Sequence, residues 1–565
     1  MKIKKWWMES VGYQIYPKSF YDSNNDGIGD LIGIYEKLDY LASLGVNLIW
    51  ICPFYDSPMD DQGYDVRNFF DVSEEFGTME DVKKLIEKAH QLGMKVILDY
   101  VLNHTSDEHP WFIESRKSKD NPYRDYYIWH DGQIKNGIKV EPTNWGSFFG
   151  GSCWKYDEPS DSYYMKIFSD KMPDLNWENE KVRQELIQVG QKWLDMGIDG
   201  FRLDAISHLD RAEFKDIENT KDEYPLDWHK FSNLPKVHDY LKELNQKLFS
   251  KSDCLTIGEV GGEASIASGL KYATFDSNEL SMVFNFDHNW CNNIDDVLST
   301  KKLVTDVVKL KSVFNKWQTA FKDKGWLPLN WLNHDQPRLM SHYGNHKYPL
   351  ESGKMLATVI HMMRGTPFIY QGEEIGMTNF LFEDADQFKD VSSINAYHRY
   401  LLEDPNPVLA LKKAALKSRD NPRTPMQWSK RFNAGFSWGK PWMPVNYNYK
   451  RINVEKNLKN QNSLWYHYQK LIQLRRFSEY HDIITYGKFK MIDMQDENLL
   501  NYLRYDASDM LLVINSFSSK MIEYEISSYH IINTIISNYK KQSIKNGKII
   551  LKPFESIVFK VKEKL

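Results

Sequence analysis

The chain has 565 residues and a net charge of −5, from 72 Lys and Arg against 77 Asp and Glu. This balance gives no strong basic field that would attract nucleic acid or an anionic membrane surface. The length excludes one ordinary domain, although a (β/α)8 barrel uses about 250 residues or more as a single unit.

The cysteine pattern and the apolar runs bear on the compartment. No CxxC pair is present, and the four cysteines lie far apart, at Cys52, Cys153, Cys254 and Cys291. This spacing disfavours structural zinc and a disulfide scaffold, and suits a reducing compartment. The first residues carry positive charges without a following apolar run, and no stretch of about 18 apolar residues occurs. We therefore expect a soluble cytoplasmic protein with no membrane partner.

Apolar runs rich in β-branched and aromatic residues recur along the chain, at residues 12–17, 46–55, 95–104, 200–205, 254–260, 282–287, 328–335 and 366–374. Amphipathic segments such as 79–93 and 179–197 lie between several of them. Buried strands that alternate with helices predict a parallel sheet. Eight of them predict an α/β fold, the (β/α)8 TIM barrel, which we assign to residues 1–104 and 174–480.

Two segments depart from this rhythm. Residues 105–173 are rich in Trp, Tyr, Gly and Asp, and are predicted to form an insertion domain after the third strand. From residue 481 short alternating runs predict a C-terminal antiparallel β domain, a β-sandwich over 481–565. Aromatic residues make up 14% of the chain, which fits either large cores or a cleft lined with flat rings that pack on sugars.

Acidic side chains stand at the ends of four predicted strands: Asp99, Asp204, Glu259 and Asp335. Reactive groups of such barrels gather at the carboxyl ends of the strands. A single acid there is usually a helix cap or an ion-pair partner, but four on different strands predict a shared site. Several acids without metal-ligand spacing favour glycosidic bond cleavage, which needs a proton donor and an anionic group together.

Basic and aromatic neighbours accompany these acids. Arg202 lies two residues before Asp204 and so on the same strand face, where it could keep Asp204 ionised. His104 and His334 stand near two of the strand ends. Each is either a satisfied core histidine or a donor to ligand hydroxyls.

Four short blocks occur in order: "DYVLNH", "GFRLDA", "GEV" and "NHD". Flanking blocks include "SPMDDQGYDV", "NWGSFFGG", "RGTPFIYQGEEIGMTN" and "RDNPRTPMQW". In these blocks the sequence resembles the α-amylase superfamily of glycoside hydrolases. Within it, the sequence is most similar to the group of oligo-1,6-glucosidases, α-glucosidases and trehalose-6-phosphate hydrolases. The resemblance covers nearly the whole chain.

The resemblance implies roles for individual residues. Asp204 would be the nucleophile, Glu259 the general acid/base, and Asp335 the acid that holds ring hydroxyls and helps to distort the sugar. The pocket for the terminal glucose would be lined by Tyr64, Asp65, His104, Arg202 and His334 and closed by Arg419, with Phe148 and Phe149 beside the next subsite. A retaining double displacement then requires carboxyl groups about 5–5.5 Å apart. We expect a raised pKa for Glu259 and a lowered one for Asp204.

The stretch "FYDSNNDGIGDL" has the first ligand positions of a calcium loop: Asp22, Asn24, Asp26, the Ile28 carbonyl and Asp30. The twelfth position is Gly33, where a calcium sensor has a bidentate Glu. The resemblance implies a structural Ca²⁺ or Mg²⁺ here, and the alternative is a metal-free turn held by its own hydrogen bonds. Asn25 replaces the usual glycine of the family, and Asn tolerates left-handed backbone angles.

The preferred substrate rests on one position. Ala205 follows the expected nucleophile, and in this family Ala there goes with α-1,4 cleavage and Val with α-1,6. We expect an exo-acting retaining α-glucosidase that acts on short oligosaccharides, leans to α-1,4 links, and is a monomer or a weak homodimer without nucleic-acid partners. The alternatives are an oligo-1,6-glucosidase, a trehalose-6-phosphate hydrolase and a sucrose hydrolase or isomerase. A non-catalytic transporter subunit is disfavoured because all three acids are present.

Overall fold

The computed structural model describes residues 4–261, 264–294 and 303–564. Its central sheet has eight parallel strands in the order β13-β12-β11-β5-β2-β1-β15-β14. They are β1 (Gly12–Ile15), β2 (Leu48–Ile51), β5 (Lys95–Val101), β11 (Gly200–Asp204), β12 (Leu255–Glu259), β13 (Met282–Phe284), β14 (Pro328–Leu329) and β15 (Thr366–Tyr370). Each lies within a predicted run. The sheet closes almost completely, with its gap between β13 and β14, so the TIM barrel prediction is confirmed.

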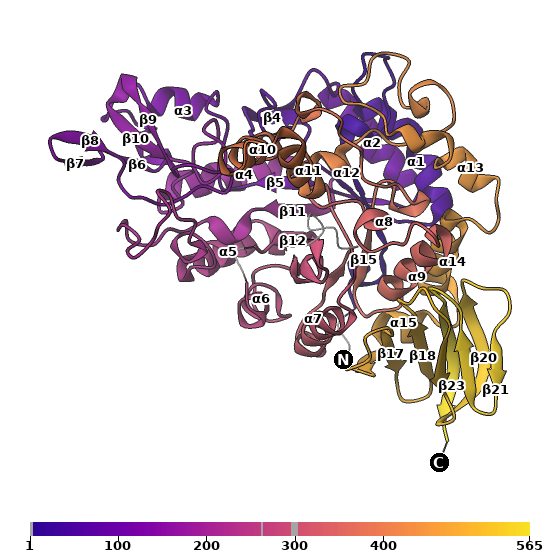
Figure 1. The fold of residues 1–565 in the computed structure, drawn as a ribbon. Helices are drawn as coiled ribbons and strands as arrows, with labels where there is room; N and C mark the ends of the chain where they lie inside the picture. Colours follow the sequence, from indigo (N-terminus) through magenta and orange to yellow (C-terminus); the bar gives the residue numbers. More distant parts are fainter. Residues whose placement is uncertain (1–3, 262–263, 295–302, 565) are drawn as a thin grey trace.

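Helices follow most of these strands, among them α1 (Leu31–Leu44), α2 (Met79–Gln91), α4 (Glu180–Asp195), α5 (Pro235–Lys247), α6 (Ile266–Ala273), α7 (Val307–Ala320), α9 (Pro349–His361) and α14 (Leu464–Phe477) (Figure 1). The predicted helices at 79–93 and 179–197 are α2 and α4. Helix α2 starts at a capping box, in which Thr78 and Asp81 exchange hydrogen bonds. Its buried face consists of Val82, Leu85, Ile86 and Ala89, which is why it packs on the barrel.

The segment between β5 and α4 forms a separate lobe on the left in Figure 1. It holds α3 (Pro110–Ser115), the antiparallel sheet β6-β10-β9 (Trp129–His130, Ser162–Met165, Trp154–Asp157) and the hairpin of β7 (Gln133–Lys135) and β8 (Ile138–Val140). A second excursion follows β15, where α10 (Val391–Glu403) and α11 (Pro407–Lys417) pack against each other before the short α12 (Asp420–Arg423).

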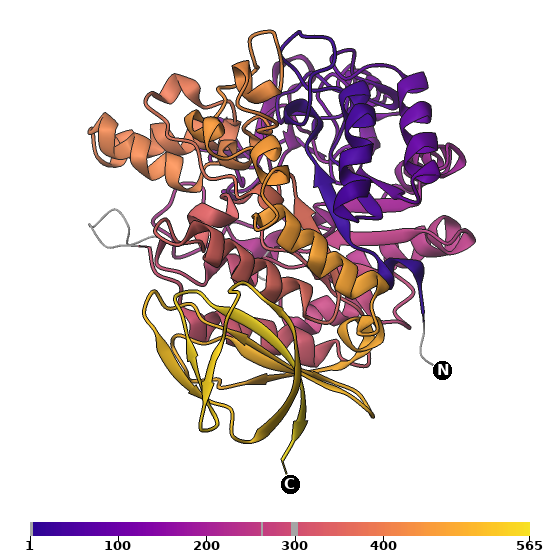
Figure 2. The ribbon, with the colours of Figure 1, turned by 90° about the vertical axis from the view of Figure 1, so that its right-hand side faces the viewer.

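The C-terminal domain lies beneath the barrel in Figure 2. One antiparallel sheet has the order β16-β17-β18-β23-β20 (Lys488–Ile492, Asn501–Tyr505, Met510–Asn515, Ser556–Glu563, Tyr529–Ser537), and the other β19-β22-β21 (Ile522–Glu525, Lys548–Leu551, Ser543–Lys545). Leu503 and Phe559 of the first sheet share one apolar cluster with Ile549 of the second. Arg504 ties the domain to the barrel by donating to the Met362 carbonyl at 2.6 Å. The predicted antiparallel domain is confirmed; the exact domain boundaries stay predictions.

The barrel interior is apolar at its lower end. Trp50 and Phe284 stack with ring centroids 5.5 Å apart, and both belong to a cluster that includes Ile257 and Phe368. Charged side chains begin above this cluster, with Asp99 and Arg202 inside β5 and β11 and with Asp204 and Glu259 at the ends of β11 and β12. Among the described residues, no helix has both the length and the apolar character needed to span a bilayer.

Candidate active site

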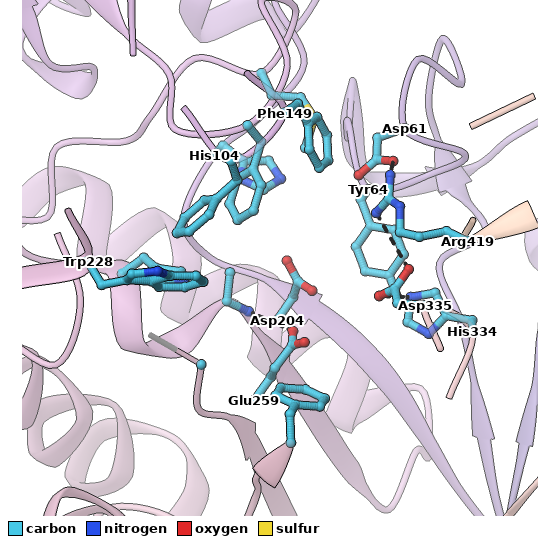
Figure 3. A pocket seen from close by; sticks show the side chains of 17 residues that line it. Asp61, Tyr64, His104, Phe149, Asp204, Trp228, Glu259, His334, Asp335 and Arg419 are labelled. Atoms are coloured by element: carbon cyan, nitrogen blue, oxygen red, sulfur yellow. Dashed lines mark hydrogen bonds and ion pairs between the residues drawn. The ribbon is translucent and has the colours of Figure 1, made fainter. Parts of the chain in front are cut away.

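A pocket with a cavity volume of about 200 Å³ opens at the carboxyl ends of the barrel strands (Figure 3). Asp204 is the last residue of β11, and Glu259 is the last residue of β12. Asp335 reaches the same pocket from the loop after β14. The lining is made by Asp61, Tyr64, His104, Phe148, Phe149, Phe168, Met172, Asp204, Ala205, His208, Trp228, Glu259, Gly261, Phe286, His334, Asp335 and Arg419. The three acids expected to carry the chemistry thus face one cavity.

Arg202 connects the acids of neighbouring strands from behind the pocket. Its Nη1 donates to Asp204 Oδ1 at 2.7 Å and also to Asp99, and its Nη2 donates to Glu259 Oε2. Only 1% of Arg202 is exposed, so it orients the carboxylates and does not itself line the cavity. Asp99 also accepts from Trp50 Nε1 at 2.6 Å, which places it beneath the pocket.

Burial sets the ionisation of the two central acids. It raises the pKa of Glu259 to about 7, although the charge of Arg202 acts in the opposite direction. It also raises the pKa of Asp204 to about 6. The expected direction for Glu259 is confirmed, and the lowered pKa expected for Asp204 is wrong. Because Arg202 divides its positive charge among three carboxylates, it does not offset the loss of water around Asp204.

Asp335 lies across the cavity, next to two arginines and a histidine. It accepts from Arg423 Nη2 at 2.6 Å and faces Arg419 Nη1 at 3.5 Å and His334 Nε2 at 3.1 Å. Burial alone would raise its pKa, but His334, Arg419 and Arg423 outweigh burial and hold the pKa well below its ordinary value. Asp335 is therefore ionised at neutral pH.

Asp61, and not Asp65, is the acid of the loop after β3 (Tyr55–Asp56) that reaches the pocket. Asp61 Oδ1 accepts from Arg419 Nη2 at 2.6 Å. Asp65 is fully buried, and its carboxylate accepts from Ser57 Oγ and from the Asp60 and Asp61 N–H groups. The assignment of Asp65 to the substrate is thus corrected: it shapes the loop that presents Asp61.

Three of the predicted ring residues, Tyr64, His104 and His334, line the cavity. Tyr64 stacks on His334 with centroids 5.2 Å apart, and His334 Nδ1 lies 2.9 Å from Gln14 Nε2. Burial lowers the pKa of both His104 and His334 to about 3, so both rings are neutral. Among the described residues, the buried His104 Nε2 and Tyr64 hydroxyl have no hydrogen-bond partner. Polar atoms of this kind are suited to ligand hydroxyls.

The other side of the cavity is aromatic. Phe148 and Phe149 line it as expected, and Arg419 lies over the Phe149 ring at 4.8 Å. Asn395 of α10 donates to the Phe149 carbonyl at 3.0 Å, which joins the insertion to the helices after β15. Seven lining residues have no counterpart in the sequence predictions: Asp61, Phe168, Met172, His208, Trp228, Gly261 and Phe286.

Ala205 lies between the two catalytic candidates. It lines the cavity and adopts a left-handed backbone with φ 46°, which is rare for residues other than Gly and Asn. Its N–H points to Glu259 Oε2 at 3.4 Å. The backbone of Ala205 therefore links the two residues, and its small side chain lines the cavity.

The loop from Asp22 to Asp30 lies outside the pocket lining. Asp22 accepts the Asn25 and Gly27 N–H groups, Asp30 caps α1 by accepting from Gly33, and Asn25 has the left-handed φ of 70°. Hydrogen bonds of this kind are what a metal-free turn would need in order to hold its own shape. Asp22 Oδ2, Asp30 Oδ2 and both carboxylate oxygens of Asp26 each accept one hydrogen bond and keep a second lone pair, so this set of hard oxygen donors also fits Ca²⁺ or Mg²⁺. Among the described residues no three His, Cys, Asp or Glu side chains converge as in a metal cluster; the loop would add an amide and a carbonyl oxygen.

Comparison with known proteins identifies the family of the chain. Residues 14–487 match the family described as alpha amylase, catalytic domain, and residues 499–558 match the alpha-amylase SusG C-terminal domain. An oligo-1,6-glucosidase of Bacillus cereus is 47% identical, over 99% of this chain and 100% of the relative. A trehalose-6-phosphate hydrolase of Bacillus subtilis is 43% identical, over 98% of each chain. The crystal structure of trehalose-6-phosphate hydrolase from Bacillus licheniformis has a TM-score of 0.91 at 43% identity, over 99% of this chain and 100% of that one. The chain therefore belongs to the α-amylase family of glycoside hydrolases.

Proposed function

We propose that this protein is an exo-acting, retaining α-glucosidase that removes terminal glucose from short oligosaccharides. The observation that carries the proposal is the pair of strand-end carboxyl groups, Asp204 and Glu259, held by one guanidinium at the mouth of the barrel. A retaining pair must lie about 5–5.5 Å apart, and a shared arginine keeps two carboxyl groups at close range.

The proposed reaction has two steps. Asp204 attacks the anomeric carbon while Glu259 gives its proton to the glycosidic oxygen, so that the bond to the leaving sugar breaks and a glucosyl ester forms. Glu259, now ionised, takes a proton from water as that water attacks the ester carbon, which frees α-glucose and Asp204. Asp335, kept ionised by its cationic neighbours, accepts hydrogen bonds from ring hydroxyls throughout.

The end of the pocket supports exo action. Arg419 lies between Asp61 and Asp335 and covers Phe149, so the cavity is closed by an ion-paired side chain on that side. Its volume of about 200 Å³ is small for a long chain of sugars. A terminal residue would enter and the rest of the substrate would extend outward.

For the linkage, we propose an α-1,6 preference. The names of several relatives, oligo-1,6-glucosidase among them, fit this alternative better than the α-1,4 preference expected from Ala205. The test is a panel of maltose, isomaltose, sucrose, trehalose and trehalose 6-phosphate, with products identified by chromatography and the first anomer by NMR. We expect isomaltose to give the highest kcat/KM and α-glucose to appear first. Faster cleavage of maltose would overturn the linkage, and β-glucose as first product would overturn the mechanism.

Ala205 provides a separate check on the linkage. The variant Ala205→Val places a branched side chain in the lining of the cavity, and we expect the ratio of isomaltose to maltose cleavage to rise. An unchanged ratio would remove this position from the linkage argument.

Three further expectations remain proposals. The loop with Asp22, Asn24, Asp26, the Ile28 carbonyl and Asp30 would hold a structural Ca²⁺ or Mg²⁺, for which its oxygen donors are suited. Such an ion would stabilise the fold and supply no chemistry to the reaction. We also propose a cytoplasmic location and a monomer or weak homodimer.

A further inference from the structure

Four rings that line the pocket form a continuous group, which we call the aromatic wall and assign to the leaving-group side: Phe148, Phe168, His208 and Trp228. Phe148 is at its centre, with ring centroids 4.5 Å from Trp228, 5.1 Å from His208 and 5.2 Å from Phe168. All four residues line the cavity. In Figure 3 Trp228 lies on the side of Asp204 and Glu259 that is opposite Asp335 and Arg419.

The aromatic wall carries no charge. His208 is its only titratable member, and Ser232 Oγ lies 2.8 Å and the Phe231 carbonyl 3.1 Å from His208 Nδ1. Burial lowers the pKa of His208 to about 3, so the ring is neutral at working pH. A flat, uncharged surface of this kind packs on the C–H face of a sugar or on an aryl ring.

The charged groups of the cavity are unfavourable to a second anion. Among the described lining residues, Arg419 is the only Lys or Arg, and its guanidinium already bonds to Asp61 and Asp390 and faces Asp335. Asp204 and Glu259 stand between Arg419 and Trp228 of the aromatic wall. A phosphate on the leaving sugar would meet these carboxyl groups and the rings without a free cation among the described lining.

We propose that the aromatic wall selects an uncharged leaving group, a second sugar or an aryl ring stacked on Trp228, and disfavours a phosphorylated sugar. Trp228 is then a specificity-determining residue for the leaving group. This inference rests on the proposed α-glucosidase function and narrows its substrate class to neutral glucosides.

The first experiment uses two pairs of substrates whose members differ chiefly in the charge of the leaving group. The 4-carboxamidophenyl and 4-carboxyphenyl α-glucosides have leaving groups of nearly equal size, and trehalose and trehalose 6-phosphate form a second pair. We expect the neutral member of each pair to have a kcat/KM at least about tenfold higher. Equal values, or a preference for either anion, would overturn the proposal.

The second experiment removes the ring. Trp228→Ala should raise KM for isomaltose and the carboxamide about tenfold, whereas Trp228→Phe should keep most of the activity. α-Glucosyl fluoride has the same glucose but no ring as leaving group, so its kcat/KM should stay within about twofold in both variants. The matched control is Trp438→Ala, because Trp438 is 67% exposed and outside the pocket lining.

The outcomes distinguish a wrong role for Trp228 from a wrong function for the protein. If Trp228→Ala lowers fluoride cleavage as much as isomaltose cleavage, or leaves isomaltose cleavage unchanged, the role of Trp228 is wrong while the enzyme remains a glucosidase. If the unmodified protein cleaves neither the fluoride nor any neutral glucoside, the proposed function itself fails.

Discussion

The two sides of the pocket are built in opposite ways. The glucose side is a network of ions in which Arg202, Arg419 and Arg423 hold acids in fixed positions. The leaving-group side is the aromatic wall, whose contacts are non-directional. Fixed dipoles and charges suit the glucose unit, which is the same in every turnover. They also suit the reacting centre, where charge develops in the transition state. Flat apolar surfaces tolerate variation, which suits the part that differs between substrates.

The largest effect is expected from Asp204→Ala, which removes the nucleophile from the ionic side. We expect a loss of more than a thousandfold in kcat for an aryl α-glucoside, because no covalent intermediate can form. Circular dichroism and the melting temperature should stay near those of the unmodified protein, and Asp253→Ala, at an exposed ion pair, is the matched control. A variant that keeps a tenth of the rate would contradict the assignment.

Glu259→Gln should separate substrates by their leaving groups. Loss of the general acid costs about 10² to 10⁴ in rate where the leaving oxygen needs a proton. We therefore expect a large loss with isomaltose and a smaller one with a nitrophenyl glucoside, measured as kcat/KM for each. Equal losses on both would count against Glu259 as the proton donor.

Asp390→Asn tests how far the ionic network extends from the substrate. Asp390 accepts from Arg419 Nε at 2.8 Å through one oxygen, and from the Ser393 N–H at 2.8 Å through the other, which caps α10. Asn keeps the cap but loses the charge that holds Arg419. We expect KM for neutral glucosides to rise about tenfold with a smaller change in kcat.

The control for this variant is Asn395→Ala, which removes only the bond from α10 to Phe149. It should raise KM much less. An Asp390→Asn protein with an unchanged KM would show that Arg419 needs no partner beyond Asp61 and Asp335.

The pH profile should report the ionic side alone, because the aromatic wall is neutral. Asp204 acts ionised, so kcat/KM should fall as pH drops below about 6, the pKa of its carboxyl group. Glu259 acts protonated, so kcat/KM should fall above about 7. The two values belong to the coupled pair and define a narrow bell. With α-glucosyl fluoride, which needs little protonation, the alkaline fall should be weaker; an equally steep fall would contradict this reading.

The smallest effect is expected from the loop of Asp22 to Asp30, which belongs to neither side of the pocket. A chelator should lower the melting temperature by about a few degrees and leave kcat unchanged, because an ion that binds only the folded state stabilises it. Asp26→Ala should show the lower melting temperature without chelator and no further change with it. An unmoved melting temperature in the unmodified protein would favour the metal-free turn.

The barrel could be predicted from sequence because each strand is a short buried run, and this signal is local. The acids Asp204 and Glu259 could be placed because a strand end fixes the position of its side chain. Loop residues are different. Asp61 and Asp65 flank Tyr64 in the same motif, and only the turn of the loop decides which carboxylate faces the cavity. Trp228 lies in a long connection without a motif, so sequence gave no signal for it.

The direction of the pKa shift of Asp204 also could not be predicted from the sequence. Arg202 next to Asp204 suggests a lowered pKa, but Asp99 and Glu259 come from other strands and take part of the same positive charge. How one guanidinium is divided depends on which strands are neighbours in the sheet. That order, β12-β11-β5, is a property of the whole fold.

The shared guanidinium of Arg202 has a consequence for anyone who wishes to engineer the acidity range of this catalyst. The proton donor and the nucleophile are bound by the same guanidinium. A substitution that strengthens or weakens its electric field at one carboxyl group therefore shifts the pKa of the other carboxyl group in the same direction. The pH range in which the enzyme is active would then move to higher or lower pH with nearly the same width. Broadening it would require a separate counterion for each acid.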